Sequence, residues 1–260
     1  MVKRLAFAHL LSYVVAAGAA VAAFTSVLVP DLHKMPVHVR PQVYGTEYAV
    51  LLVGVPLLLV TTALSARGRI GARALWFGAL AWFLSTYVSL TAGLGIGPLF
   101  LVHAALFFLS LATLVIAFVS IDLDSFLEGL PRESARKALI VGFIVMIALM
   151  VAAWRMNPTH AVEQWTAVGL FGIAVFLLAV RSAWAPIMSG IGAVMTSLFG
   201  ASQLARIGYL CVKGVTVGES TTLLTVAMFF VASALGLALA LTMRSVPDEV
   251  DPDERQNSSD

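Results

Sequence analysis

Apolar residues dominate this chain in about eight long stretches, which short polar segments separate. A helix needs about 20 mostly apolar residues to cross the roughly 30 Å hydrocarbon core of a bilayer, because each residue advances it by about 1.5 Å. The pattern therefore predicts an all-α, polytopic bundle of about eight transmembrane helices. The predicted segments are Leu5–Val29, Tyr48–Ser65, Ala74–Gly93, Pro98–Ile121, Lys137–Met156, Gln164–Ala183, Pro186–Tyr209 and Thr221–Met243.

Two of these segments are open to another interpretation. Only the run from Arg181 to Pro186 separates the sixth from the seventh, so seven helices result if they merge or if one is re-entrant. The first segment follows a basic start and resembles a signal peptide. Its apolar run reaches Val29, however, which exceeds the roughly 7 to 15 residues of a typical signal sequence. We therefore expect an uncleaved first helix.

The distribution of Lys and Arg predicts the orientation, because these residues stay preferentially on the cytoplasmic side. With eight helices, eleven of the 16 Lys and Arg residues fall on the side of the termini and five on the other. Both termini are therefore expected in the cytoplasm, with residues 1–244 in the membrane of a bacterial cell. Residues 245–260 are acidic, contain two prolines and have no aromatic side chain, which predicts a disordered cytoplasmic tail.

Composition supports an integral membrane protein and excludes several classes. The chain is 60% hydrophobic and 12% charged, with a mean hydropathy of +0.96, whereas soluble domains carry about 25% charged residues. Its net charge is +2 and its basic residues lie at helix ends, so no nucleic acid is expected as a partner. Cys211 is the only cysteine, which excludes internal disulfides and cysteine-based metal sites.

The seventh predicted helix carries a polar stripe near its outer end. Ser202, Arg206, Tyr209 and Lys213 are spaced by four, three and four residues, so they share one helix face. Arg206 lies about one turn inside the membrane, where exposure to lipid would cost up to about 2.5 to 3.5 kcal/mol. Arg206 must therefore extend to the headgroups or have polar neighbours.

Candidates for such neighbours gather at the same end of other predicted helices. They suggest a pocket in which Arg206 and Lys213 attract an anionic small molecule or lipid headgroup and the acids orient these cations. Membrane lipids and this ligand are the expected partners. The candidate ligand-binding residues are Arg206, Lys213, Glu47, Tyr87, His103 and Glu163.

Simpler structural explanations compete with this hypothesis. Lys213 and Arg206 can act as snorkelling anchors, and His103 can be a hydrogen-bonded interior residue. The hydroxyl side chains of the third predicted helix, including Ser85 and Thr86, can serve interhelical bonding. In the second predicted helix, Pro56 is expected to introduce a kink, because proline lacks the backbone N–H that the helix needs. 

No sequence motif supports catalysis, and no cofactor or metal is expected. A retinal protein needs a lysine deep in its last helix, whereas Lys213 is shallow and lies on the next-to-last one. A bis-histidine haem site needs paired histidines, whereas His9 and His103 lie at opposite ends. An H-E-x-x-H motif and a glycine-rich phosphate loop are both absent. We expect a non-enzymatic protein. The alternatives are a secondary transporter or transporter subunit, and a membrane enzyme acting on a lipid or isoprenoid with His103 or Glu163 as base.

Three stretches resemble a group of uncharacterised multi-pass bacterial membrane proteins. Those proteins have an L-V-G-x-P helix, here Leu52–Pro56, and a K-G-V-T segment, here Lys213–Thr216. Between these they have a helix with the pattern P-L-F-L-x-x-A-L-F-x-L-S-L, to which the stretch GPLFLVHAALFFLSLATLVIAF of this chain is similar. The resemblance covers roughly residues 44–230 and implies a shared fold, but it brings no activity. Those relatives often have a tyrosine where His103 stands and an aspartate early in the sixth helix, where this chain has Thr166. If that aspartate pairs with the lysine in the relatives, Lys213 must here pair with Glu163 or Glu219, or be solvated.

Overall fold

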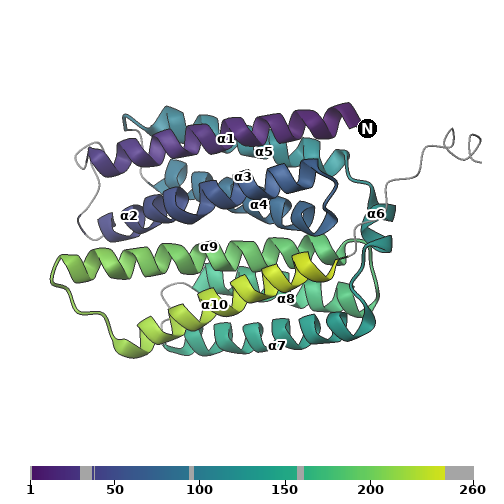
Figure 1. The fold of residues 1–260 in the computed structure, drawn as a ribbon. Coiled ribbons are helices and arrows are strands. Elements are labelled where there is room, and N and C mark those ends of the chain that lie inside the picture. Colours follow the sequence, from purple (N-terminus) through teal and green to yellow (C-terminus); the bar gives the residue numbers. More distant parts are fainter. Residues whose placement is uncertain (1, 30–36, 38, 94–96, 157–160, 244–260) are drawn as a thin grey trace, which may run out of the picture.

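The computed structural model describes residues 2–29, 37, 39–93, 97–156 and 161–243, and within these ranges the chain forms helices and no strand. Figure 1 shows the helices lying side by side along one direction. The predicted acidic tail, residues 245–260, lies outside the described residues. In chain order the helices are α1 (Val2–Leu28), α2 (Arg40–Ala49), a π-helical turn η2 (Val50–Gly54), α3 (Val55–Ala66), α4 (Ile70–Gly93), α5 (Phe100–Val119), α6 (Leu123–Glu128), α7 (Glu133–Met156), α8 (Ala161–Ala179), α9 (Ala185–Val212) and α10 (Glu219–Thr242).

Seven helical spans within the described ranges are long and apolar enough to cross a membrane. In this set α2, η2 and α3 form one continuous span, Arg40–Ala66. The apolar part of α8, Trp165–Ala179, is shorter and is not one of the seven. The prediction of an all-helical, multi-pass architecture is therefore supported. The predicted division between the sixth and seventh segments is also confirmed, because α8 ends at Ala179 and α9 begins at Ala185.

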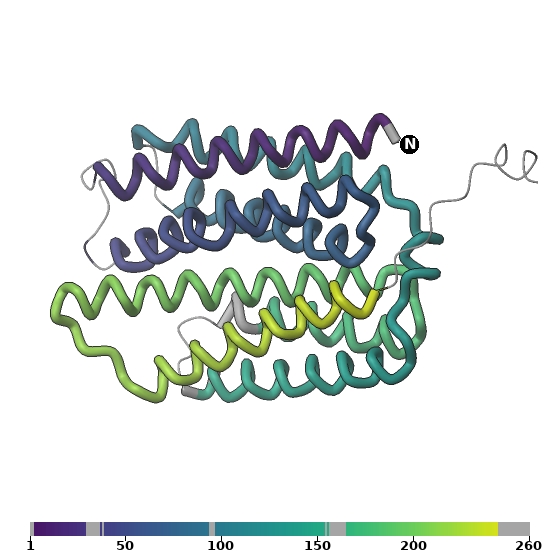
Figure 2. The backbone as a smooth tube through the Cα atoms, in the orientation of Figure 1, coloured from purple at the N-terminus to yellow at the C-terminus, as the bar shows by residue number. Residues whose placement is uncertain are grey.

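The helices form two four-helix units with the same order. In the first unit α1 contacts α3, α3 contacts α4, α4 contacts α5, and α5 contacts α1 again. The second unit closes in the same way through α7, α8, α9 and α10. Figure 2 shows that α1 and α7 both start near α6 and run toward the opposite end. We name these ends the α6 end and the Arg206 end, where α2 begins and α9 finishes.

Small residues hold the two units together. A Cβ atom added to Gly78 of α4 would lie 2.5 Å from the Gly190 carbonyl oxygen of α9, and one added to Gly190 would overlap the Ala74 carbonyl group. Glycine at these positions lets two helix backbones approach closely and pack by van der Waals contact, which drives helix association in lipid. The contact between α4 and α9 therefore fixes the position of one unit on the other.

The span that contains α2 is bent at η2. The Val55 N–H donates to the Val50 carbonyl oxygen, five residues back, and Pro56 follows directly without an N–H of its own. π-helical turns and proline are common causes of helix bends. The predicted interruption near Pro56 is thus confirmed. The two arms on either side of it pack differently: α2 packs mainly on α9 of the second unit, while α3 packs on α1 and α4 of the first.

Candidate functional site

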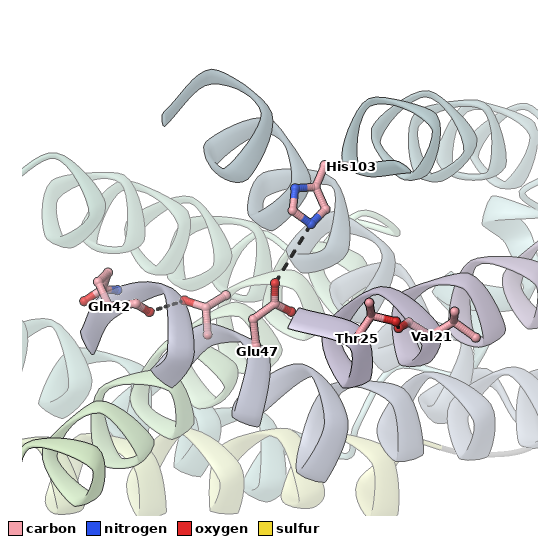
Figure 3. Close-up of polar contacts among 6 residues, drawn as sticks. Val21, Thr25, Gln42, Glu47 and His103 are labelled. Carbon is pink, nitrogen blue, oxygen red and sulfur yellow. Dashed lines mark hydrogen bonds and ion pairs between the residues drawn. The ribbon is translucent and has the colours of Figure 1, made fainter. Parts of the chain in front are cut away.

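Three of the predicted site residues meet in the core of the first unit. Glu47 of α2, Tyr87 of α4 and His103 of α5 have exposed fractions of 0%, 0% and 1%. Figure 3 shows the Glu47 carboxylate pointing toward the His103 ring, with 3.9 Å between Glu47 Oε1 and His103 Nε2. The Tyr87 and His103 ring centroids are 5.8 Å apart. The side chain of Ser26 on α1 also lies beside Glu47. We name these four residues the Glu47 cluster.

The electrostatics of the Glu47 cluster follow from its burial. An isolated charge in an apolar core costs several kcal/mol, so a buried carboxylate is neutralised by a proton or by an opposite charge. At 3.9 Å, Glu47 Oε1 and His103 Nε2 are too far apart for a direct hydrogen bond but close enough for a strong charge interaction. Within the described residues, the buried Tyr87 hydroxyl has no hydrogen-bond partner. The cluster therefore concentrates acid, base and phenol groups away from water.

Arg206 occupies the opposite face of α2. Glu47 follows Gly45 by two residues, which turns its direction on the helix by about 200°. A Cβ atom added to Gly45 would lie 2.8 Å from the Arg206 backbone nitrogen, so this face of α2 rests directly on α9. Arg206 and the Glu47 cluster are therefore placed on two sides of one helix.

A chain of amide side chains connects Arg206 to the start of α2. The Arg206 guanidinium donates to Gln203 Oε1 at 3.1 Å, and Gln203 Nε2 donates to Gln42 Oε1 at 3.4 Å. Arg206 itself is half-buried. The arginine is thus oriented along the α2–α9 interface rather than extended alone into lipid.

Lys213 lies at the C-terminal end of α9 and is exposed. Its Nζ is 5.8 Å from the centroid of the Tyr209 ring, a cation–π distance. Gly214 then adopts a φ of 76°, and the Val215 N–H donates to the Leu210 carbonyl oxygen at 3.0 Å. This six-residue bond with a left-handed glycine is the usual way to end a helix. The K-G-V-T segment is therefore a helix stop, and its lysine faces the negative end of the helix dipole.

The sixth predicted residue, Glu163, falls in α8, and its side chain lies outside the described residues. Glu219, an alternative partner for Lys213, is in the first turn of α10, where an acid favours the positive end of the helix dipole. The structure thus gathers three predicted residues in the Glu47 cluster, and places Arg206 and Lys213 one after the other on α9.

A cavity of about 480 Å³ lies between the two units near the Arg206 end. Small-molecule sites commonly measure about 300 to 1,000 Å³, so this volume suits a ligand of that size. The lining residues that the structure describes are all uncharged, and eight of them carry hydroxyl or amide groups. The lining residues are Val39, Gln42, Val43, Thr46, Trp82, Ser85, Thr86, Ser89, Leu90, Gly93, Met150, Thr166, Ala167, Leu170, Met195, Thr196, Phe199, Ser202 and Met228.

The cavity and the Glu47 cluster share their helices. Thr46 and Thr86 line the cavity, and the next residues in sequence are Glu47 and Tyr87 of the cluster. Successive residues of a helix differ in direction by about 100°, so α2 and α4 each present one face to the cavity and another to the cluster. The hydroxyl groups of the third predicted helix were visible in the sequence. Their role as a cavity wall was missed, because it depends on which helices pack against that face of α4.

A second buried polar group lies toward the α6 end of the first unit. His9 Nε2 is 3.0 Å from Ser65 Oγ, and the Trp76 indole N–H donates to Ser12 Oγ at 2.9 Å. The His9 and Trp76 rings also contact each other, with centroids 4.7 Å apart. These interactions satisfy the buried groups and join α1, α3 and α4. This group therefore has a structural role that needs no ligand.

Comparison with known proteins returned nothing: no family model, no curated protein and no solved structure matches this chain. The functional assignment must therefore come from the geometry of the cavity, Arg206 and the Glu47 cluster.

Proposed function

We propose that this chain is a non-enzymatic, eight-helix protein of the bacterial cytoplasmic membrane that binds an anionic amphipathic molecule. The apolar part of the ligand occupies the cavity, and its negative head group lies toward Arg206. The observation that carries this proposal is the hydrogen-bonded chain from the uncharged cavity wall at Gln42 through Gln203 to the Arg206 guanidinium. It combines an apolar volume with a cation at one end.

The distribution of charge around the cavity favours this orientation of the ligand. The described part of the lining carries no charged side chain, so it suits a hydrocarbon chain with a few polar contacts. Guanidinium groups bind carboxylates and phosphates in a planar, often bidentate geometry. Lys213, exposed beyond Arg206 on α9, adds positive charge that attracts an anion along the membrane surface.

The orientation in the membrane follows the distribution of basic residues. Basic side chains near the α6 end include Arg67, Arg69, Arg136 and Lys137, and these favour the cytoplasmic side. With α8 as an eighth crossing, both termini lie in the cytoplasm and the Arg206 end faces outward. The cavity then receives its ligand at the outer leaflet.

Transport is a second candidate, which a specific feature favours. Many transporters are built from two structural repeats and have interrupted helices beside the substrate site. Here two four-helix units share one order, and the bend at η2 lies in the span whose start lines the cavity. Uptake of a labelled anionic amphiphile into proteoliposomes separates transport from binding alone.

A quenching experiment tests the proposed function. Trp82 lines the cavity, so a single-chain fatty acid brominated in its tail is expected to quench Trp82 emission saturably when it binds the purified protein. Trp82→Phe should remove this component. Trp184→Phe is the matched control, because Trp184 stands at the start of α9, at the α6 end.

The same titration tests the head-group contact. Hydrogen bonds to charged groups contribute about 1.5 to 3 kcal/mol, so Arg206→Ala should weaken binding about tenfold or more. Lys213→Ala, at the exposed helix end, should weaken it less. Equal quenching in the wild type and Trp82→Phe, or binding unaffected by Arg206→Ala, would refute the proposal.

A further inference from the structure

The ligand proposal leaves the Glu47 cluster without a role. Within the described ranges, Glu47 is the only fully buried carboxylate, and it lies in a span that is long and apolar enough to cross a membrane. Ionisable groups at such positions are costly and usually serve proton or ion pathways. A carboxylate, an imidazole, a phenol and a hydroxyl, one from each of four helices, meet here.

We propose that Glu47 and His103 form a proton-binding site, separate from the cavity, that controls the cavity through α2. With one proton between them the two groups have no net charge, which is the state that an apolar core favours. When the pair gains or loses a proton it carries a net charge. The attraction across the 3.9 Å between Glu47 Oε1 and His103 Nε2 is then lost, and the charged pair requires water.

The other groups around Glu47 limit how this charge can be balanced. From α4, Tyr87 contributes a phenol, and from α1, Ser26 contributes a hydroxyl group that does not titrate. On α9, Arg206 lies across α2 beside Gly45, and Arg40 on α2 itself is about two turns away. His103 is therefore the titratable base that faces Glu47 directly.

The bend at η2 gives α2 a way to respond. A π-helical turn followed by proline has fewer regular backbone bonds, so it is a place where the arm before it can tilt. One face of this arm carries Glu47, and another carries Gln42 and Thr46 of the cavity wall. A tilt that separates Glu47 from His103 therefore moves the cavity wall as well.

Trp82 lies at the junction of these parts and can report the movement. A Cβ atom added to Gly54 of η2 would lie 2.7 Å from Trp82 Cζ3, and Trp82 also lines the cavity. A change in α2 should therefore alter the surroundings of the Trp82 ring even when no ligand is bound.

The decisive measurement is a pH titration by ¹⁹F NMR of the full chain labelled with fluorotryptophan, in detergent and without added ligand. The chain has five tryptophans, and Trp82→Phe identifies the resonance of Trp82. In the wild type this resonance should shift with pH. The shift should be lost in Glu47→Gln and in His103→Gln, which keep the size and polarity of the side chains.

Gln42→Leu is the matched control, because it changes the cavity wall on α2 and leaves the acid–base pair intact. It should retain the pH-dependent shift. A flat titration in the wild type, or a shift that persists in Glu47→Gln and His103→Gln, would overturn the proposal. If one of the variants Glu47→Gln and His103→Gln does not fold, the titration of the other is sufficient to test the proposal.

Control of the cavity by the Glu47–His103 pair rests on the proposed function, which is binding of a ligand in that cavity. A second titration tests the control and the binding separately. Binding of the brominated fatty acid is measured on both sides of the pH transition. The affinity of the wild type should change, and that of Glu47→Gln should not. If no quenching occurs at any pH, the proposed function fails, whereas the ligand-free titration still decides whether the proton-binding site exists.

Discussion

The two four-helix units have the same helix order, but their cores differ in the polarity of the buried side chains. Within the described residues, the fully or nearly fully buried ionisable side chains all belong to the first unit and its arm α2. They are His9, Tyr44, Glu47, Tyr87 and His103. The interior that α7 and α8 contribute to the second unit is apolar, with Phe143, Met146, Met150, Phe171 and Leu178. One arrangement of helices therefore tolerates either kind of core, provided that its polar groups are neutralised.

The difference extends to the second helix of each unit. In the first unit this helix is long and bent, because η2 and Pro56 interrupt it. In the second unit, α8 is a single α-helix with no such interruption within its described residues. The arm before this interruption, α2, packs on α9 and lines the cavity between the units. We infer that the second unit is a rigid support and the first carries the parts that respond.

The largest effect is expected from breaking the apolar core of the second unit. Phe171 is fully buried and its ring packs on Phe143, with centroids 5.2 Å apart. Phe171→Ala removes a buried ring and leaves a cavity, which costs about 3 to 5 kcal/mol. Thermal unfolding in detergent should show a strongly lowered midpoint. The Trp82 resonance of the protein that remains folded should still titrate, and loss of that titration would contradict the division of roles.

A somewhat smaller effect is expected at the contact between the units. Gly190→Ala places a methyl group against the Ala74 carbonyl group, and the two helices must separate. Such overpacking typically costs about 1 to 3 kcal/mol. Gly172→Ala is the control, because nothing lies within 4 Å of a Cβ atom there. Equal unfolding midpoints of the two variants would show that the close α4–α9 contact does not hold the units together.

Much of the fold was predictable from the sequence because a membrane imposes a length on each apolar segment. The α8–α9 division, for example, follows from the polar run that begins at Arg181. The bend near Pro56 was also predictable. Its π-helical form was not, because a proline in an apolar run indicates an interruption but does not specify which backbone hydrogen bonds replace the α-helical ones.

The candidate site was less accessible to prediction. Glu47, Tyr87 and His103 could be grouped because each occupies the same depth in its predicted helix. Depth does not determine which face of a helix a residue occupies relative to its neighbours, however. For this reason the sequence could not show that Arg206 and the Glu47 side chain lie on opposite sides of α2. It also could not show that Thr46 and Thr86 line a cavity.

The turn that follows α3 in the first unit can be compared directly with the turn that follows α8 in the second. In the first, Gly68 has a φ of 77° and the Arg69 N–H donates to the Leu64 carbonyl oxygen at 3.1 Å. In the second, Arg181 has a φ of 55° and the Ser182 N–H donates to the Leu177 carbonyl oxygen at 2.9 Å. The two turns are alike, but a side chain in the left-handed region costs roughly 1 to 2 kcal/mol.

Exchanging the residue types at these turns should therefore have opposite effects. Arg181→Gly should stabilise the protein by about 1 kcal/mol, and Gly68→Ala should destabilise it by a similar amount. Both changes are measured as shifts of the unfolding midpoint. Destabilisation by Arg181→Gly would indicate that the arginine side chain anchors the second unit at the membrane surface. The free energy of that anchoring would then exceed the cost of the backbone strain.

A similarly small effect is expected at α6, which connects the units. Asp122 caps this helix: its carboxylate accepts a hydrogen bond from the Asp124 N–H at 3.2 Å and another from the Ser125 hydroxyl. The Ser125 hydroxyl bond is the main reason why the pKa of Asp122 lies below its ordinary value. The stabilisation is therefore present above the pKa of the unfolded chain and is lost as pH falls through the lower, folded-state pKa.

Asp122→Ala should consequently lower the stability by about 1 kcal/mol at neutral pH. Asp122→Asn keeps a capping oxygen but cannot titrate, so the difference between this variant and the wild type should change only at acidic pH. Unfolding midpoints at neutral and acidic pH test both expectations. Because α6 lies at the end of the molecule opposite to the cavity (Figure 1), neither substitution should alter the pH titration of Trp82. An altered titration would mean that the connection itself transmits changes between the units.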